Sequence, residues 1–247
     1  RRSRRDPRIR DRGKVHLNCA SVENILIKPL TSFVKEGSEM AKEDQYRNPQ
    51  GDEGRKVIEE MNEHHRELTS WGLGQISAIE GLRPKKILDI GCGGGNCLRM
   101  LTTRYPNAHA DGIDISEEAV KVTLDRNAVY HSWGKIDAQV ASVSDLPFPE
   151  KSFDLVTAIE TYFFWPDLEK DLAHAASRLK EGGVMLIVSE QYPNGKNDEA
   201  LKEACLKYGM NILPNEEVAS LMEKAGLKTQ TFTNEDKNWV AFVGVRQ

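Results

Sequence analysis

The sequence predicts an α/β fold, a doubly wound sheet of seven strands that ends in an antiparallel hairpin. Three observations support this fold. From residue 85 onward, short apolar runs alternate with stretches of helical periodicity, which is typical of a parallel sheet covered by helices on both faces. A glycine-rich loop directly follows the first run. The last two runs have no helix between them, so we expect them to pair as an antiparallel hairpin at one edge.

The residues before this alternation divide into two parts. Residues 1–45 show no sustained periodicity, and the first twelve hold seven arginines and two aspartates. Such charge runs are usually solvated, so we expect a basic, flexible extension. Residues 46–80 have apolar positions at helical spacing and predict a helical cap. Because Gly72, Gly74 and Gly81 interrupt that region, we expect two helices rather than one.

The third part, residues 81–247, contains the sheet. The expected strands are 86–90, 109–115, 137–143, 153–159, 184–189, 228–233 and 239–245. The expected helices are 97–104, a helix capped by Ser116 that runs to about residue 130, 168–179, 198–208 and 216–224. Gly182 and Gly183 are expected to end the helix at 168–179.

Composition narrows the class of protein. The four cysteines show no disulfide spacing, which favours a reduced, cytoplasmic protein. No apolar run approaches the ~20 residues of a membrane helix, so no membrane association is expected. The formal net charge is −4, and the first twelve residues carry +5, so the remainder carries −9. That acidic remainder argues against a nucleic-acid partner. The sequence leaves a homodimer open.

The residues that indicate a ligand-binding site lie where the first strand ends. Asp89 closes this strand, and Gly91, Gly93 and Gly95 follow directly. In doubly wound sheets, ligands bind beyond the carboxyl ends of the strands, at the point where the strand order reverses. Because glycine has no Cβ, the backbone of such a loop can approach a ligand closely.

Two further acidic residues sharpen this prediction. Asp114 ends the second strand and lies 19 residues after Gly95. In nucleoside-binding folds, an acidic residue at about this position hydrogen-bonds to the ribose hydroxyls. Ser116 already serves as the helix cap, so Asp114 is not needed for that role. In the loop after the third strand, Asp145 could accept a hydrogen bond from an adenine amine, with Leu146 or Val143 against the ring.

These motifs together resemble those of class I S-adenosylmethionine (SAM)-dependent methyltransferases over roughly residues 81–247. They are Asp89-Ile-Gly-Cys-Gly-Gly-Gly95, Asp114-Ile115, Ser144-Asp145-Leu-Pro-Phe148 and Phe153-Asp-Leu-Val-Thr-Ala-Ile-Glu160. The resemblance implies a Rossmann-like sheet, an N-terminal helical cap over the pocket, and SAM as cofactor, with S-adenosylhomocysteine as product. The cofactor contacts it implies are Asp89, Gly91, Cys92, Gly93, Asp114, Ile115, Ser144, Asp145, Leu146 and Glu160.

Methyl transfer is an in-line displacement, so the protein mainly aligns a nucleophile and excludes water. If a general base acts, Glu160 is the first candidate, because a carboxylate at a strand end in a closed cleft can have a raised pKa. Tyr162 is the second catalytic candidate. Many small-molecule members of the family carry a histidine after the fourth strand, and here an aromatic cluster at 162–165 stands in its place. His64 and His65 are weaker candidates.

No metal site is expected, because His64 and His65 are adjacent on a predicted helix and point about 100° apart. Aromatic residues predict a small, partly apolar acceptor; they are Tyr46, Trp71, Tyr162, Phe163, Phe164 and Trp165. One alternative is a nucleic-acid methyltransferase that uses the arginine-rich arm. Another is an NAD-dependent oxidoreductase, which is disfavoured because Asn96 occupies the loop position of a helix-packing Gly or Ala and Asp89 would face a pyrophosphate.

Overall fold

The computed structural model describes residues 43–247. The arginine-rich arm, and nearly all of the extension expected at residues 1–45, lie outside the described residues.

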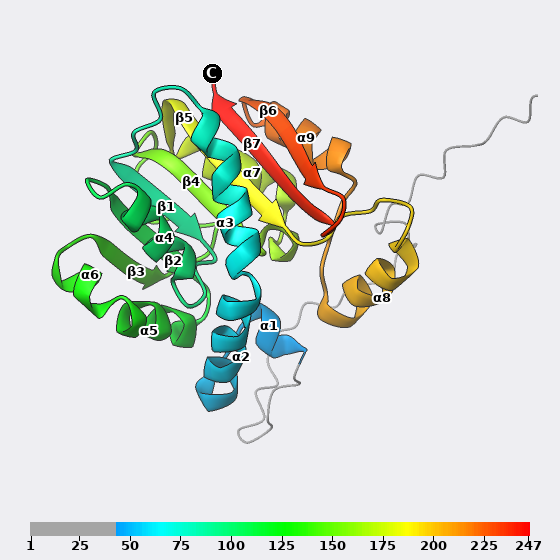
Figure 1. Cartoon of the computed structure of the whole chain (residues 1–247), viewed down its shortest axis with the longest axis horizontal. Coiled ribbons are helices and arrows are strands. Elements are labelled where there is room, and N and C mark those ends of the chain that lie inside the picture. The colour runs from blue at the N-terminus through cyan, green and yellow to red at the C-terminus, as the bar shows by residue number, and fades with distance from the viewer. Residues whose placement is uncertain (1–42) are drawn as a thin grey trace, which may run out of the picture.

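Seven strands form one sheet in the order β3-β2-β1-β4-β5-β7-β6 (Figure 1). They are β1 (Lys86–Ile90), β2 (His109–Asp114), β3 (Ile136–Val140), β4 (Phe153–Ile159), β5 (Leu179–Ser189), β6 (Leu227–Asn234) and β7 (Trp239–Arg246). Strands β1 to β5 pair in parallel, and β7 lies antiparallel to both β5 and β6. The predicted doubly wound sheet and its terminal hairpin are therefore confirmed.

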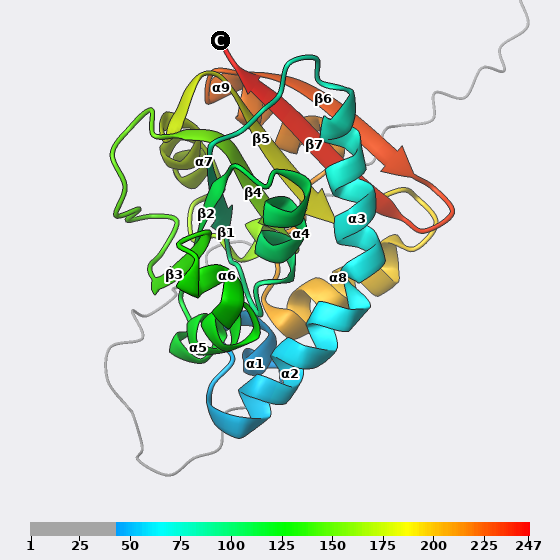
Figure 2. The same ribbon diagram turned by 60° about the vertical axis from the view of Figure 1, so that its left-hand side comes forward.

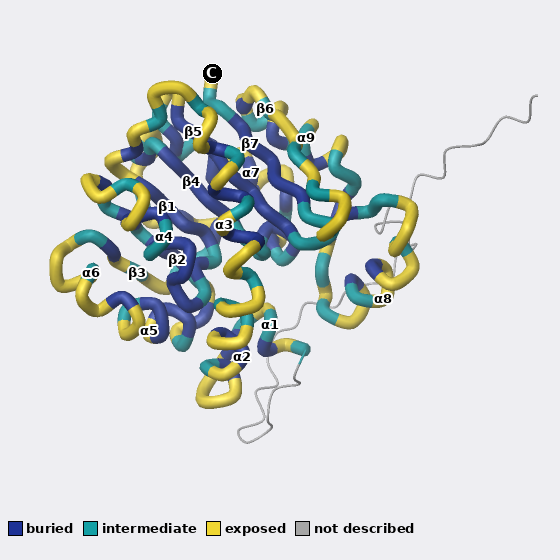
Figure 3. The backbone as a smooth tube through the Cα atoms, viewed as in Figure 1, coloured by how far each residue is buried: buried dark blue, intermediate teal, exposed yellow. Residues whose placement is uncertain are grey.

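Helices cover both faces of this sheet (Figure 2). The α-helices of residues 43–247 are α1 (Asp44–Arg47), α2 (Gly51–His64), α3 (Arg66–Gln75), α4 (Asn96–Arg104), α5 (Glu117–Arg126), α6 (Ala128–Ser132), α7 (Leu168–Ser177), α8 (Asp198–Tyr208) and α9 (Asn215–Lys224). Helices α3 and α4 pack on one face, and α7 and α9 on the other, which leaves the central strands buried (Figure 3). Among residues 43–247, no helix has the length and apolar character needed to cross a membrane.

Several element boundaries differ from the prediction. The helix expected at 168–179 ends at Ser177, and β5 begins at Leu179 instead of Val184. Leu179 pairs with Phe153, and after an irregular step Val184 pairs with Leu155. Pairing with β4 thus draws the glycine pair at 182–183 into the strand. The helix expected from Ser116 to about residue 130 splits into α5 and α6 at Asn127.

The N-terminal helices also break at an unpredicted place. Helix α2 ends at His64, and α3 starts at Arg66 and continues through Gly72 and Gly74. A Cβ on Gly72 would overlap the side chain of Val188, so this glycine lets α3 lie close to β5. Helix α3 is therefore part of the core packing, whereas α1 and α2 lie at the carboxyl end of the parallel strands (Figure 2).

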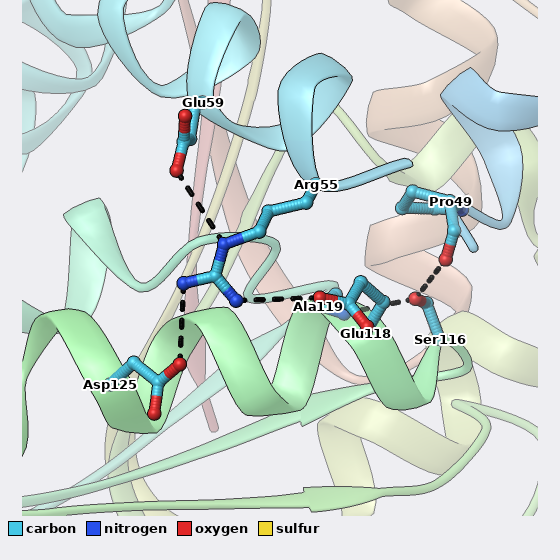
Figure 4. A network of polar contacts seen from close by, with 7 residues as sticks. All are labelled: Pro49, Arg55, Glu59, Ser116, Glu118, Ala119 and Asp125. Carbon is cyan, nitrogen blue, oxygen red and sulfur yellow. Dashed lines mark hydrogen bonds and ion pairs between the residues drawn. The ribbon is translucent and has the colours of Figure 1, made fainter. Parts of the chain in front are cut away.

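A polar network fixes α2 against α5 (Figure 4). The guanidinium of Arg55 contacts Glu59 on its own helix and Glu118 and Asp125 on α5. Ser116 accepts a hydrogen bond from the backbone of Ala119, as predicted for a helix cap, and its hydroxyl donates to the carbonyl of Pro49. The segment 49–64 is thereby held across the end of the sheet, over the loop that follows β1.

Candidate active site

The central strands β1 and β4 are neighbours, and the chain leaves them in opposite directions, so their carboxyl ends form the switch point of the sheet. A cavity of about 190 Å³ opens there, lined by the loops after β1, β2, β3 and β4 and by residues of α2. This is the place where a doubly wound fold binds its ligand.

The glycine loop after β1 forms one wall of this first cavity. Gly91 has φ +72°, and a Cβ there would overlap the side chain of Thr161 in the loop after β4. A Cβ on Gly94 would overlap Asn62 and Ile58 of α2. A Cβ on Gly93 would meet no atom within 4 Å, so this stretch of backbone is open to a ligand.

Asp89 is a buried carboxyl group in the same wall, only 2% exposed. The hydroxyl of Thr157 on the neighbouring strand donates to it. Burial raises the pKa of Asp89 to about 7, the negative charge of Asp114 adds to that shift, and hydrogen bonds from Thr157 and Cys97 oppose it.

Asp114 is held in place by two backbone amides. Its carboxylate oxygens accept hydrogen bonds from the amides of Gly93 and Ser116, each at 3.0 Å. Burial raises the pKa of Asp114, and these hydrogen bonds oppose the shift. The carboxylate therefore bridges the glycine loop and the start of α5. Seven of the ten predicted cofactor contacts line this cavity together: Asp89, Gly91, Cys92, Gly93, Asp114, Ile115 and Glu160.

The other three predicted contacts, Ser144, Asp145 and Leu146, do not line the cavity. The hydroxyl of Ser144 donates to Asp171 on α7, and Leu146 is buried in the core. Asp145 is exposed, and its backbone amide donates a hydrogen bond to the carbonyl of Ser142. Ser142 and Val143 line the cavity instead, and the cofactor contacts of Ser144 and Leu146 stay predictions. The adenine contact of Asp145 stays a prediction.

Glu160 follows β4 in a left-handed backbone conformation, with φ +55°. Non-glycine residues rarely adopt this region, and strain of this kind gathers at functional sites. One oxygen of its carboxyl group accepts a hydrogen bond from the backbone amide of Glu190, the residue after β5. Burial raises the pKa of Glu160 to about 8, and the negative charge of Glu190 adds to the shift.

A second cavity of about 510 Å³ lies beside the first. Five residues line both cavities: Tyr46, Met61, His65, Glu160 and Phe164. The rest of the second wall comes from α2, from the segment after β5 and from α8 and the chain beyond it, and it includes Phe163, Met210 and Ile212. Two adjoining cavities with a common wall suit two ligands that must meet.

Tyr162 lines neither cavity, and its role as a catalytic residue stays a prediction. Its side chain is 1% exposed, packs edge-on against Phe163 and Phe242, and has its pKa raised by burial. The other aromatic residues predicted for the acceptor pocket lie in different places. Tyr46 and Phe164 line both cavities, Phe163 lines the second and Trp165 the first. Trp71 lines neither cavity and packs on Trp239.

Glu190 and the unpartnered side chain of Asn62 are site residues that sequence reasoning missed. Glu190 lies within reach of both neighbouring histidines, with its oxygens 2.9 Å from Nε2 of His64 and 3.9 Å from Nε2 of His65. In the described part of the chain, these three form the one group whose donor atoms lie close enough to hold a metal ion. The expectation of divergent histidines assumed one continuous helix, and α2 ends between them.

Comparisons with known proteins agree with this geometry. Residues 87–183 match the family model described as a methyltransferase domain. The ubiquinone biosynthesis O-methyltransferase of Thiobacillus denitrificans is 30% identical over 187 residues, which cover 68% of this chain and 75% of that protein. The fatty-acid O-methyltransferase of Mycolicibacterium smegmatis is 28% identical over 59% of this chain. The match covers 52% of that relative, so the chain spans about half its length.

A solved structure shows the same fold. Geranyl diphosphate C-methyltransferase from Streptomyces coelicolor A3(2), in complex with S-adenosylhomocysteine, superimposes with a TM-score of 0.65 at 15% identity. The superposition covers 80% of this chain and 85% of that chain. The motifs, the site at the switch point and these relatives agree: this chain belongs to the class I SAM-dependent methyltransferases, and its cofactor is SAM.

Proposed function

We propose that the protein transfers the methyl group of SAM to a small, partly apolar acceptor bound in the second cavity. The observation that carries this proposal is the wall shared by the two cavities, with the carboxyl group of Glu160 in it. A methyl group held on one side of this wall would lie next to a nucleophile held on the other side, which is the alignment that an in-line displacement needs.

The side chains of the first cavity fit SAM, which supplies a methyl group on a positively charged sulfur. Asp114 presents a carboxylate, fixed by two amides, that can accept from ribose hydroxyls. Asp89 offers a buried carboxyl group, which the methionine ammonium group beside it would hold in the ionised form. The buried Nδ2 of Asn62 has no hydrogen-bond partner among the described residues, and Asn62 lines the same cavity. We assign this nitrogen to the carboxylate of the methionine part, since a buried donor without a partner is costly.

The second cavity supports an acceptor with an apolar body. Phe163, Phe164 and Met210 contribute apolar surface, which excludes water from the reacting atoms. Glu160 is placed next to those atoms, where its carboxyl group orients the nucleophile of the acceptor. Its assignment as a general base stays a prediction.

Calorimetry with SAM tests the cofactor half of the proposal. We expect micromolar binding to the full chain, lost in Asp114→Ala. The matched control is Asp111→Ala, because Asp111 lies on the same strand, bonds to His109 and does not line the first cavity. Equal loss of affinity in both variants, or no binding to the unaltered protein, would contradict the proposal.

Release of S-adenosylhomocysteine, measured across a panel of small acceptors, tests the other half. An active acceptor should give a product heavier by one methyl group. In Glu160→Gln we expect kcat to fall while SAM affinity is kept. A panel in which nucleic acid alone supports turnover would favour the arm-dependent alternative, which falls on residues outside the described part. The family assignment leaves no support for the NAD-dependent alternative.

A further inference from the structure

We propose that His64, His65 and Glu190 form a binding site for one divalent transition-metal ion in the wall of the acceptor cavity. Binding of the ion does not depend on the proposed function. Its role toward an acceptor does rest on that function, because all three side chains line the second cavity.

The convergence of the two imidazoles follows from the break between α2 and α3. His64 is the last residue of α2, and His65 lies at the joint with φ −85° and ψ 7°. The two rings lie edge to face with their centres 5.0 Å apart, so they do not diverge as they would on a continuous helix. Glu190 reaches them from the end of β5.

The donor set suits metals such as Zn²⁺ and Co²⁺. One nitrogen from each histidine and one carboxylate oxygen all lie within 4.8 Å of one another. Zinc bonds to such atoms are about 2.0–2.2 Å long, so the donor atoms must draw together by about 1 Å around an ion. His64 has 66% of its side chain exposed and is free to make that movement. Two imidazoles and a carboxylate are a common donor set for catalytic zinc and leave further coordination positions open.

The charges around the second cavity favour a cation. Its wall contains the carboxyl groups of Glu60 and Glu190, and no lysine or arginine among residues 43–247 lines it. A simple ion pair between a protonated His64 and Glu190 would also explain their 2.9 Å contact. That pair would not require His65, so the role of His65 separates the two interpretations.

An ion at this position would face the space assigned to the acceptor. The open coordination positions would then take an oxygen atom of that molecule, which identifies the acceptor class as one with an anionic oxygen on an apolar body.

The test uses the full chain without a histidine tag, freed of metal by a chelator. Titration with Co²⁺, followed by visible absorption, should give one bound equivalent with nitrogen and oxygen ligands. Calorimetry with Zn²⁺ gives the affinity. We expect His65→Ala and Glu190→Gln each to weaken binding by more than about tenfold. His109→Ala is the matched control, because His109 bonds to Asp111 at 3.0 Å elsewhere on the surface, and it should bind as the unaltered chain does.

Circular dichroism reports whether each variant is folded, because His65 also lines the first cavity and its substitution can change SAM affinity directly. SAM affinity of the unaltered chain keeps this inference apart from the proposed function. Lack of a Co²⁺ spectrum in protein that binds SAM would overturn the metal site alone. Equal Zn²⁺ affinity in His65→Ala and His109→Ala would overturn it as well.

Addition of 3-phenylpropionate should shift the Co²⁺ spectrum, whereas 3-phenylpropanol should not. An unchanged spectrum with the carboxylate would overturn the assignment of the acceptor class.

Discussion

Asp89 makes the stability of the ligand-free protein depend on pH. Its carboxyl group has a pKa of about 7 in the folded chain, and the ordinary value is 3.8. Between these values the folded state holds a proton that the unfolded state has lost. The contribution of Asp89 to the free energy of unfolding is therefore highest below about pH 4, falls as the pH rises toward 7, and levels off above that.

Asp89→Asn removes this titration and tests it. The asparagine oxygen can still accept from Thr157, so the change is mainly one of charge. We expect the variant to gain about 2–3 kcal/mol relative to the unaltered chain between about pH 5 and pH 8. Urea unfolding followed by circular dichroism, without SAM, gives both values. Parallel pH profiles for the two proteins would show that Asp89 is not the group responsible.

The sequence predicted the position of individual site residues where that position follows directly from a nearby strand. Asp89 and Asp114 close strands that are evident from their apolar runs, so their place at the sheet edge followed from the fold class. The contacts of Ser144 and Leu146 depend on how a loop folds onto α7 and the core, which no local pattern encodes. Glu190 reaches the site through the fold alone, since its partners are more than one hundred residues away.

Helix α3 offers a matched pair of glycines for testing how an element packs. A Cβ on Gly72 would overlap Val188 of β5, whereas a Cβ on Gly74 would meet no atom within 4 Å. We expect Gly72→Ala to destabilise the fold by about 1–3 kcal/mol through overpacking. Gly74→Ala should stabilise it by about 0.5–1 kcal/mol, because alanine favours the helix. Urea midpoints measure both effects, and a stabilising Gly72→Ala would refute the close packing of α3 on β5.

The bounds of the helices show which elements could be predicted from the sequence and which could not. Periodicity located α4, α8 and α9 to within a residue or so, because each is a regular amphipathic segment with clear ends. Gly72 and Gly74 were expected to interrupt the helix, but α3 continues through both, and Gly72 lets it lie close to the sheet. At 182–183, pairing of β5 with β4 overrides the local preference of glycine for a helix end.

At the scale of the whole molecule, the second cavity is assembled from segments far apart in the chain. Tyr46 of α1 stacks edge-on against Tyr208 of α8, with ring centres 5.3 Å apart, and both residues line the cavity. The first cavity depends mostly on loops after adjacent strands, which the fold class places together. The sequence therefore identified the cofactor, whereas the acceptor side required the packing of α1, α2 and α8.

Closure of the first cavity depends on how firmly the segment 49–64 is attached to the sheet domain. Two kinds of contact hold it (Figure 4). Arg55 is 40% exposed and makes its ion pairs at the surface, where such pairs contribute little to stability. Ser116 is buried, caps α5 and donates to Pro49, which lines the first cavity.

We therefore expect Ser116→Ala to cost about 1–2 kcal/mol of stability and Arg55→Ala to cost less than Ser116→Ala. Loss of the Ser116 hydroxyl also leaves the Pro49 carbonyl without its donor and loosens Asn62 and Ile58 over the glycine loop. SAM affinity should fall in Ser116→Ala and stay nearly unchanged in Arg55→Ala. Thermal unfolding and calorimetry on both variants test this order. If Arg55→Ala cost more in either measurement, the surface charges rather than the buried hydroxyl would be holding α2 in place.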